Sequence, residues 1–247
     1  MDQQTAIITG ASTGIGKSIT QLFLKEGYHV VMNSSSQENL EKAHAAFGSP
    51  NNAVLVAGDI SRRAVADQLV KTAVDKFGSV DVLINNAGVF TPKPFLEVDE
   101  SELDAFLTVN LKGTYYASQA AVKQMLMQSG GSIINIGTVL VDHAIAGFPA
   151  TAPIASKGAI HAFTRQLAAE FGKDNIRVNT IAPGIIRSPL QGKIGVDDAD
   201  SLAGLHLLDR IGEPEEVAAA AHYLATAEFV TGETFNVAGG HTVGHAI

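Results

Sequence analysis

The sequence predicts an α/β fold in which a doubly wound, seven-stranded and mostly parallel sheet is covered by helices on both faces. Three observations predict it: short apolar runs rich in β-branched residues, amphipathic stretches between them, and a glycine-rich turn after the first run. Runs that are apolar throughout indicate strands buried on both faces, as in parallel sheets. We expect strands over 6–9, 29–32, 53–56, 80–84, 132–136, 177–181 and 234–237.

Helical stretches separate these runs, and right-handed crossovers would place them on both sides of the sheet. We expect helices over 18–26, 37–47, 62–77, 102–127, 154–171 and 215–225. No linker or repeat interrupts the alternation, so residues 1–247 are expected to form a single domain. The least regular part, near 188–210, is long for a connection, and we expect it to form a lid-like substrate segment.

Length and composition exclude several classes of protein. The 247 residues are 46% hydrophobic and 17% charged, which is enough to bury a sizeable core. A net charge of −8 argues against a nucleic-acid partner. The absence of cysteine excludes disulfides and thiolate metal sites, and no metal site is expected. The first strand is reached by Thr5 and no run of eighteen apolar residues occurs, so we expect no signal peptide, no membrane span and a cytoplasmic location.

The turn after the first strand is predicted to bind phosphate. Residues 9–16 read Thr-Gly-Ala-Ser-Thr-Gly-Ile-Gly and lead directly into a helical stretch. A helix start exposes unpaired backbone N–H groups and the positive end of the helix dipole, and glycine lets a pyrophosphate approach the backbone. Because the spacing of Gly10, Gly14 and Gly16 differs from the commoner Gly-x-Gly-x-x-Gly pattern, the other strand ends must support this interpretation.

Ligands of such sheets bind at the carboxyl ends of the strands, so the residues that follow each run are the candidates for a site. In chain order the motifs are the glycine turn at 9–16, Asp59, Asn-Asn-Ala-Gly at 85–88, Asn110, Ser156-Lys157 and Pro183-Gly184. Together, over nearly the whole length, they resemble the compact, one-domain short-chain dehydrogenases/reductases. The resemblance implies a Rossmann-type sandwich, a nicotinamide cofactor, and hydride transfer between that cofactor and a carbonyl or alcohol substrate.

The resemblance also implies which residues bind the cofactor. The glycine turn would hold the pyrophosphate, Asp59 would accept a hydrogen bond from the adenine amino group, and Ile60 would pack on the adenine ring. The Pro183-Gly184 turn would lie beneath the nicotinamide, near Ser188. The complete set is Gly10, Ser12, Thr13, Gly14, Ile15, Gly16, Ser34, Ser35, Asp59, Ile60, Asn86, Ala87, Gly88, Lys157, Pro183, Gly184 and Ser188.

The end of the second strand reports on the type of cofactor. An acidic residue there would bond the ribose 2′-OH of NAD and repel a 2′-phosphate, whereas this chain has Ser34 followed by Ser35. These hydroxyls can donate to a phosphate, so NADP is favoured over NAD. Two observations leave the choice open: position 13 carries no arginine, and a serine-rich turn also suits the cap of the next helix.

The catalytic side matches the family in two of four positions and keeps a hydroxyl at a third. Asn110 and Lys157 stand where the family has its catalytic Asn and Lys, and Thr138 supplies a hydroxyl where the family has Ser. The family's proton donor, a tyrosine four residues before the lysine, is replaced by Pro153. Proline has no acid–base group, although its fixed φ and missing N–H suit the first turn of a helix.

Another residue would therefore have to supply the proton. No Tyr-x-x-x-Lys occurs anywhere in the chain. His143, five residues after Thr138, is the best candidate because imidazole titrates near neutral pH. The alternative interpretation is that His143 is an ordinary loop histidine without a catalytic role. Lys157 is the second candidate if burial lowers its pKa.

Three functions remain open at this point. The first is an NAD(P)-dependent oxidoreductase with a non-standard proton donor. The second is a dinucleotide-binding relative without redox activity, serving as a structural or regulatory subunit, and the third is a lyase or isomerase on the same scaffold. The partner is expected to be a small carbonyl or alcohol, and the resemblance implies a homo-oligomer, either tetramer or dimer.

Overall fold

The computed structural model describes residues 3–188, 192 and 198–244. Its centre is a seven-stranded sheet in the order β3-β2-β1-β4-β5-β6-β7. The predicted seven-stranded sheet is confirmed, and every pairing between neighbouring strands is parallel. The strands are β1 (Thr5–Thr9), β2 (His29–Ser34), β3 (Ala53–Ala57), β4 (Val82–Asn85), β5 (Gly131–Ile136), β6 (Ile176–Pro183) and β7 (Thr234–Val237).

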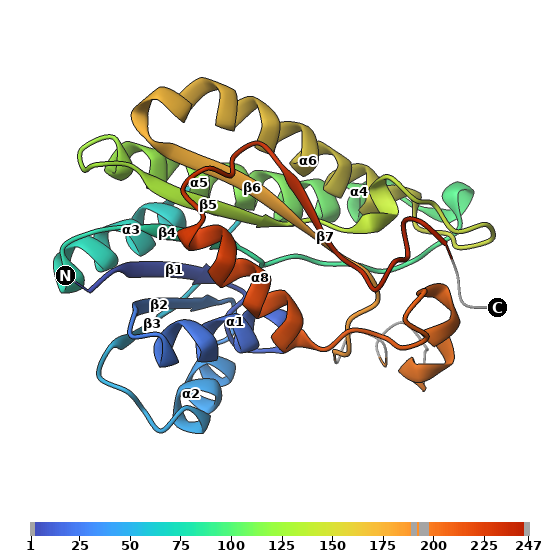
Figure 1. Cartoon of the computed structure of the whole chain (residues 1–247), viewed down its shortest axis with the longest axis horizontal. Helices are drawn as coiled ribbons and strands as arrows, with labels where there is room; N and C mark the ends of the chain where they lie inside the picture. Colours follow the sequence, from blue (N-terminus) through green and yellow to red (C-terminus); the bar gives the residue numbers. More distant parts are fainter. Residues whose placement is uncertain (1–2, 189–191, 193–197, 245–247) are drawn as a thin grey trace.

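Helices cover both faces of this sheet, which confirms the doubly wound α/β sandwich (Figure 1). One face carries α1 (Gly14–Lys25), α2 (Gln37–Ala46) and α8 (Pro214–Thr226), and the other carries α3 (Arg63–Phe77), α5 (Gly113–Met125) and α6 (Thr151–Phe171). The shorter helices are η1 (Phe95–Glu97), α4 (Glu100–Phe106), η2 (Leu107–Lys112), η3 (Val139–Val141), η4 (Gly172–Asp174) and η5 (Ala199–Leu205).

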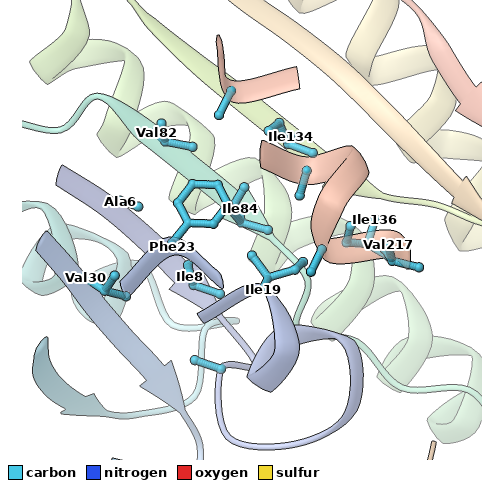
Figure 2. Close-up of a cluster of buried hydrophobic side chains, with 14 of the residues drawn as sticks. Ala6, Ile8, Ile19, Phe23, Val30, Val82, Ile84, Ile134, Ile136 and Val217 are labelled. Atoms are coloured by element: carbon cyan, nitrogen blue, oxygen red, sulfur yellow. The ribbon is translucent and has the colours of Figure 1, made fainter. Parts of the chain in front are cut away.

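The hydrophobic core lies in two layers, one on each side of the sheet. In the first layer Phe23 of α1 lies over Ala6, Ile8 and Ile84 of β1 and β4 (Figure 2). The second layer joins Ile7 and its neighbours in the sheet to α3 and α5. Alternate residues of each strand therefore enter opposite layers, which is why the strands are apolar throughout.

The expected elements are found with small shifts of their ends and one correction. The stretch 102–127, expected as one helix, is divided into α4, a π-helical segment η2 and α5. The physical reason lies in Asn110, whose side chain is fully buried within η2 and bonds groups outside its own helix. Single π-helical turns of this kind occur preferentially at functional positions.

The order of the strands places the candidate site. The chain runs outward from β1 to β3 and then returns to β4 on the other side of β1, so the strand order reverses between β1 and β4. Crevices at the carboxyl ends of such a reversal are the usual ligand sites. In the described part of the expected lid, η5 lies beyond the strand arrowheads (Figure 1); residues 189–191 and 193–197 fall outside the described residues. No helix in the described ranges combines the length and apolarity needed to cross a bilayer.

Candidate active site

The glycine turn builds an open helix start. Gly10 has a φ of +64°, and a Cβ there would lie 2.7 Å from Asn86 Nδ2. A Cβ on Gly16 would lie 2.2 Å from the carbonyl oxygen of Gly10, so neither position has room for a side chain. Within the described residues, the side chain of Thr13 makes no capping hydrogen bond to the first turn of α1. The backbone N–H groups of that turn are therefore available to an anion.

The loop after β4 is bonded to this turn across the reversal of strand order. Asn86 Nδ2 donates to the carbonyl oxygens of Thr9 (3.0 Å) and Gly10 (3.1 Å). In return, Thr9 Oγ1 accepts from the backbone N–H groups of Asn86 and Ala87, both at 3.0 Å. These four bonds hold the two loops as one unit, which makes the floor of a site between β1 and β4.

The end of β2 presents hydroxyl groups to the same floor. Ser34 is buried, and its Oγ accepts from Ser12 Oγ at 3.1 Å, whereas Ser35 is exposed. Asp59 is exposed after β3 and its Oδ1 accepts from the backbone N–H of Ser61. Ile60 is buried against Gly113 of α5. The expected contacts of Asp59 and Ile60 with adenine stay predictions.

Gly88, Asn110 and Lys157 meet at the end of β4. A Cβ added to Gly88 would lie 3.0 Å from Asn110 Oδ1 and 3.4 Å from Lys157 Nζ. Asn110 Oδ1 accepts from the backbone N–H of Val89 at 2.8 Å, and Lys157 Nζ donates to the carbonyl oxygen of Ile136 at 2.6 Å. Burial lowers the pKa of Lys157 to about 8. An amine so close to neutral can hold or release a proton near physiological pH.

Pro153 occupies the first turn of α6, and its backbone carbonyl is hydrogen-bonded into the site. Asn110 Nδ2 donates to Ser156 Oγ at 2.9 Å, and Ser156 Oγ donates to the carbonyl oxygen of Pro153 at 2.7 Å. Both Pro153 and Ser156 are buried. The chain of bonds fixes the start of α6 relative to η2, and it contains no acid that could donate a proton to a substrate.

The four tyrosines lie in other parts of the fold. Tyr28 packs on Phe23, and Tyr223 packs on Phe235. Tyr115 packs on Phe163, and Tyr116 lies under the guanidinium of Arg63. Each tyrosine thus has its ring contacts away from the Gly88 and Lys157 cluster.

The loop after β5 carries a hydroxyl and a histidine to the same end of the sheet. Thr138 caps η3, and its Oγ1 accepts from the backbone N–H of Leu140 at 3.3 Å. His143 follows η3 and is half-buried, with its backbone N–H donating to the carbonyl oxygen of Val139 at 2.9 Å. The ring of His143 packs edge-to-face on His241, at 5.2 Å between centroids. The structure therefore places His143 against another ring, not on an open loop.

His161 of α6 is a buried histidine beside this cluster that the sequence motifs do not single out. It lies one helical turn after Lys157, is 2% exposed, and its Nε2 would lie 2.3 Å from a Cβ on Gly137. Neither ring nitrogen makes a hydrogen bond to a described residue, and Asp142 Oδ2 is 3.8 Å from Nδ1. Burial lowers the pKa of His161, opposed by the charge of Asp142. The (i, i+4) spacing from Lys157 was the signal that could have found it.

The turn after β6 lies at the same end of the sheet as the residues above. The backbone N–H of Gly184 donates to the carbonyl oxygen of Val237 at 3.0 Å, which fixes the turn after β6. A Cβ on Gly14 would lie 3.6 Å from Ser188 Cβ, so the base of the expected lid reaches the glycine turn. His206 closes the turn from the other side.

These features fit a dinucleotide. At the strand ends the structure brings together an uncapped helix start, glycines with no room for side chains, and the amine of Lys157 beside Gly88. In the described residues no group of three or more His, Cys, Asp or Glu side chains is arranged to hold a metal ion.

Comparison with known proteins agrees with this geometry. A family model described as enoyl-(acyl carrier protein) reductase matches residues 10–242. The chain is 36% identical to the 3-oxoacyl-[acyl-carrier-protein] reductase FabG of Thermotoga maritima over 97% of this chain and 98% of the relative. It is 33% identical to (2S)-[(R)-hydroxy(phenyl)methyl]succinyl-CoA dehydrogenase subunit BbsD of Thauera aromatica, over 98% of each chain.

Solved structures show the same relationship. A Serratia marcescens short-chain dehydrogenase/reductase mutant superposes with a TM-score of 0.89 at 31% identity, covering 98% of this chain and 99% of the other. ElxO with NADP bound superposes with a TM-score of 0.90 at 28% identity, covering 97% and 98%. The protein belongs to the short-chain dehydrogenase/reductase family.

Proposed function

We propose that the protein is an NADP-dependent oxidoreductase that reduces a carbonyl to an alcohol with His143, not a tyrosine, as proton donor. The observation that carries the proposal is the convergence of Asn110 Oδ1 and Lys157 Nζ on Gly88, at 3.0 and 3.4 Å from its Cβ position. A protein that only binds a dinucleotide has no evident need for an amine with a pKa near 8 at that point.

The bound nicotinamide cofactor would supply the hydride. Lys157 would bind the ribose beside the nicotinamide, and the Pro183-Gly184 turn would support the ring. Thr138 Oγ1 would donate a hydrogen bond to the substrate carbonyl and make its carbon more electrophilic. His143 would transfer its ring proton to the carbonyl oxygen as the hydride reaches the carbon, and water would then reprotonate the neutral imidazole.

The hydroxyls at the end of β2 support NADP over NAD. Ser34 and Ser12 are joined at 3.1 Å, and no carboxylate stands at this strand end to repel a 2′-phosphate. The related ElxO structure has NADP bound. Two relatives named above act, by their names, on acyl thioesters, so 3-oxoacyl thioesters are the first substrates to test.

One experiment tests cofactor and chemistry together. Purified protein is titrated with NADPH and NADH while the thermal midpoint is recorded, and turnover is then measured on 3-oxoacyl thioesters and small ketones. We expect the larger shift with NADPH, and at least about a 100-fold loss of turnover in His143→Ala, as for removal of a general acid. Equal turnover of His143→Ala and the unchanged protein would leave Lys157 as the donor. Cofactor binding without turnover on any substrate would favour the redox-inactive alternative.

A further inference from the structure

Three histidines form a continuous row at the carboxyl end of the sheet. The ring centroids of His143 and His241 are 5.2 Å apart at an interplanar angle of 89°, and those of His241 and His206 are 5.3 Å apart at 75°. They come from the loop after η3, the turn after β7 and the end of η5. Segments distant in sequence therefore contact one another through these rings.

The inner end of the row is anchored on the turn after β6. His206 is 1% exposed, its Nε2 accepts from the backbone N–H of Ile185 at 3.1 Å, and its Nδ1 faces the carbonyl oxygen of Ala203 at 3.3 Å. An imidazole that accepts at Nε2 carries its proton on Nδ1. A Cβ on Gly184 would lie 2.9 Å from Nε2, so the glycine is needed for the ring to lie there.

The middle of the row is held by backbone contacts. His241 is fully buried, and its backbone N–H donates to the carbonyl oxygen of Ala238 at 2.9 Å. Ala238 packs with Val139 of η3 and Ala182 of β6 in a small apolar cluster. That cluster brings the loop of His143 and the turn of His241 together.

The two inner rings are more deeply buried than the outer ring of His143. A proton on Nε2 of His206 would break its bond with Ile185, and a charge on the fully buried His241 would be poorly solvated. His143, at the outer end, is half-buried. At the outer end, Asp142 precedes His143 in the chain and lies 3.8 Å from His161. At the inner end, His206 lines a small cavity together with Arg210 and Glu216, which form an ion pair.

We propose that His241 and His206 are positioning residues that hold the ring of His143 over the nicotinamide turn. Edge-to-face packing fixes the plane of each ring, and the bond from Ile185 fixes the last ring to the turn itself. The row thus ties the proposed donor loop to the Gly184–Ile185 backbone. The inference rests on the proposed function, since it assigns a role to the residue named there as donor.

Paired substitutions separate positioning from simple stability. His241→Ala removes the middle ring, and His241→Phe restores a ring of similar size. His206→Leu removes the acceptor for the Ile185 N–H, and His206→Gln restores an acceptor. His29→Ala is the matched control, because His29 stacks on Phe77 at 4.3 Å at the start of β2, outside this site.

Two measurements are made on each variant. The first follows the ring ¹⁵N signals of His143 by NMR against pH in the protein without cofactor, and the second follows turnover against pH. For His241→Ala and His206→Leu we expect displaced His143 signals, a shifted acid limb of the pH profile and at least about a tenfold loss of turnover. We expect His241→Phe and His206→Gln to recover most of that loss, and His29→Ala to change neither His143 measurement.

The outcomes distinguish this inference from the proposed function. His143 ring signals in His241→Ala and His206→Leu that titrate as in the unchanged protein would overturn the positioning role, whatever the turnover. If His143→Ala keeps full turnover while those signals move, the donor assignment fails and the row still holds the His143 ring.

Discussion

The candidate site has two sides, one at the ends of β1 and β4 and one at the ends of β5 and β6, and they are built differently. On the β1 and β4 side, backbone groups make the site: glycines, an open helix start and the amide of Asn86. On the β5 and β6 side, side chains from η2, α6 and the loop after η3 make it, and they include the half-buried Lys157, the buried His161 and the buried Pro153. Backbone groups of the first half do not depend on which side chains are present. The chemistry of the second half does depend on its individual side chains.

The substitution Lys157→Met tests the β5 and β6 side of the site most strongly. We expect at least about a 10³-fold loss of turnover, because the side chain that would hold the ribose and tune the proton transfer is removed. The same change should raise the free energy of unfolding at pH 7 by about 1–3 kcal/mol, because burial disfavours the charged form.

The stabilisation expected for Lys157→Met depends on pH, because the pKa of Lys157 is lowered in the folded protein. Below pH 8 both folded and unfolded chains carry the charge, so the cost of burying it is fully present. Between about pH 8 and 10.5, the usual pKa of lysine, the folded lysine loses its proton and the cost disappears. Denaturant titrations at pH 7 and 10 measure this, with the exposed Lys123→Met as control. A variant less stable than the unchanged protein at pH 7 would contradict it.

On the cofactor side, Gly16→Ala should abolish tight binding. Its Cβ would lie 2.2 Å from the Gly10 carbonyl oxygen and 2.4 Å from Asn86 Nδ2, so the two bonded loops must separate. We expect cofactor affinity to fall by about 100-fold or more and the free energy of unfolding by about 1–3 kcal/mol. Calorimetric titration with NADPH measures the affinity. Gly172→Ala is the control, since nothing lies within 4 Å of its Cβ position and its φ is −60°. A Gly16→Ala protein that binds as tightly as the control would refute the proposed pyrophosphate site.

The smallest expected effect tests the buried histidine of the catalytic side. His161→Leu should stabilise the protein by about 1 kcal/mol at pH 7.5, because an imidazole without a described hydrogen-bond partner is replaced by an apolar side chain. His161 has a lowered pKa, so the unfolded chain binds a proton more readily as the pH falls below about 6.5. The unchanged protein should therefore lose stability between pH 7.5 and 5.5, and the variant should lose less.

Unfolding by urea at the two pH values measures this difference. His44→Leu serves as the control, because its Nε2 has a partner 3.2 Å away in the carbonyl oxygen of Pro50. If His161→Leu destabilised the protein equally at both pH values, the ring would hold a partner that stabilises it.

Much of the fold could be predicted from the sequence, together with the glycine turn between β1 and α1. The seven strands and the outer helices follow from local periodicity, and the glycine turn follows from the short-range constraint that only glycine fits at Gly10 and Gly16. The π-helical turn at Asn110 could not be predicted, because its cause is a set of bonds to Val89 and Ser156, which are remote in sequence. The expected homo-oligomer and cellular location stay predictions.

The sequence by itself determined the parallel α/β architecture and the glycine turn at 9–16, because both depend on adjacent residues or fixed spacings. The phosphate site at that turn and the place of Pro153 in the family's tyrosine position stay predictions from the sequence. Tertiary structure alone decided that Lys157 meets Gly88 and that His161 is buried beneath Gly137. It also joined His143 to His241 and His206. The physical reason is that burial and ring contacts depend on which distant segments the sheet brings to its carboxyl end, and no local pattern records that.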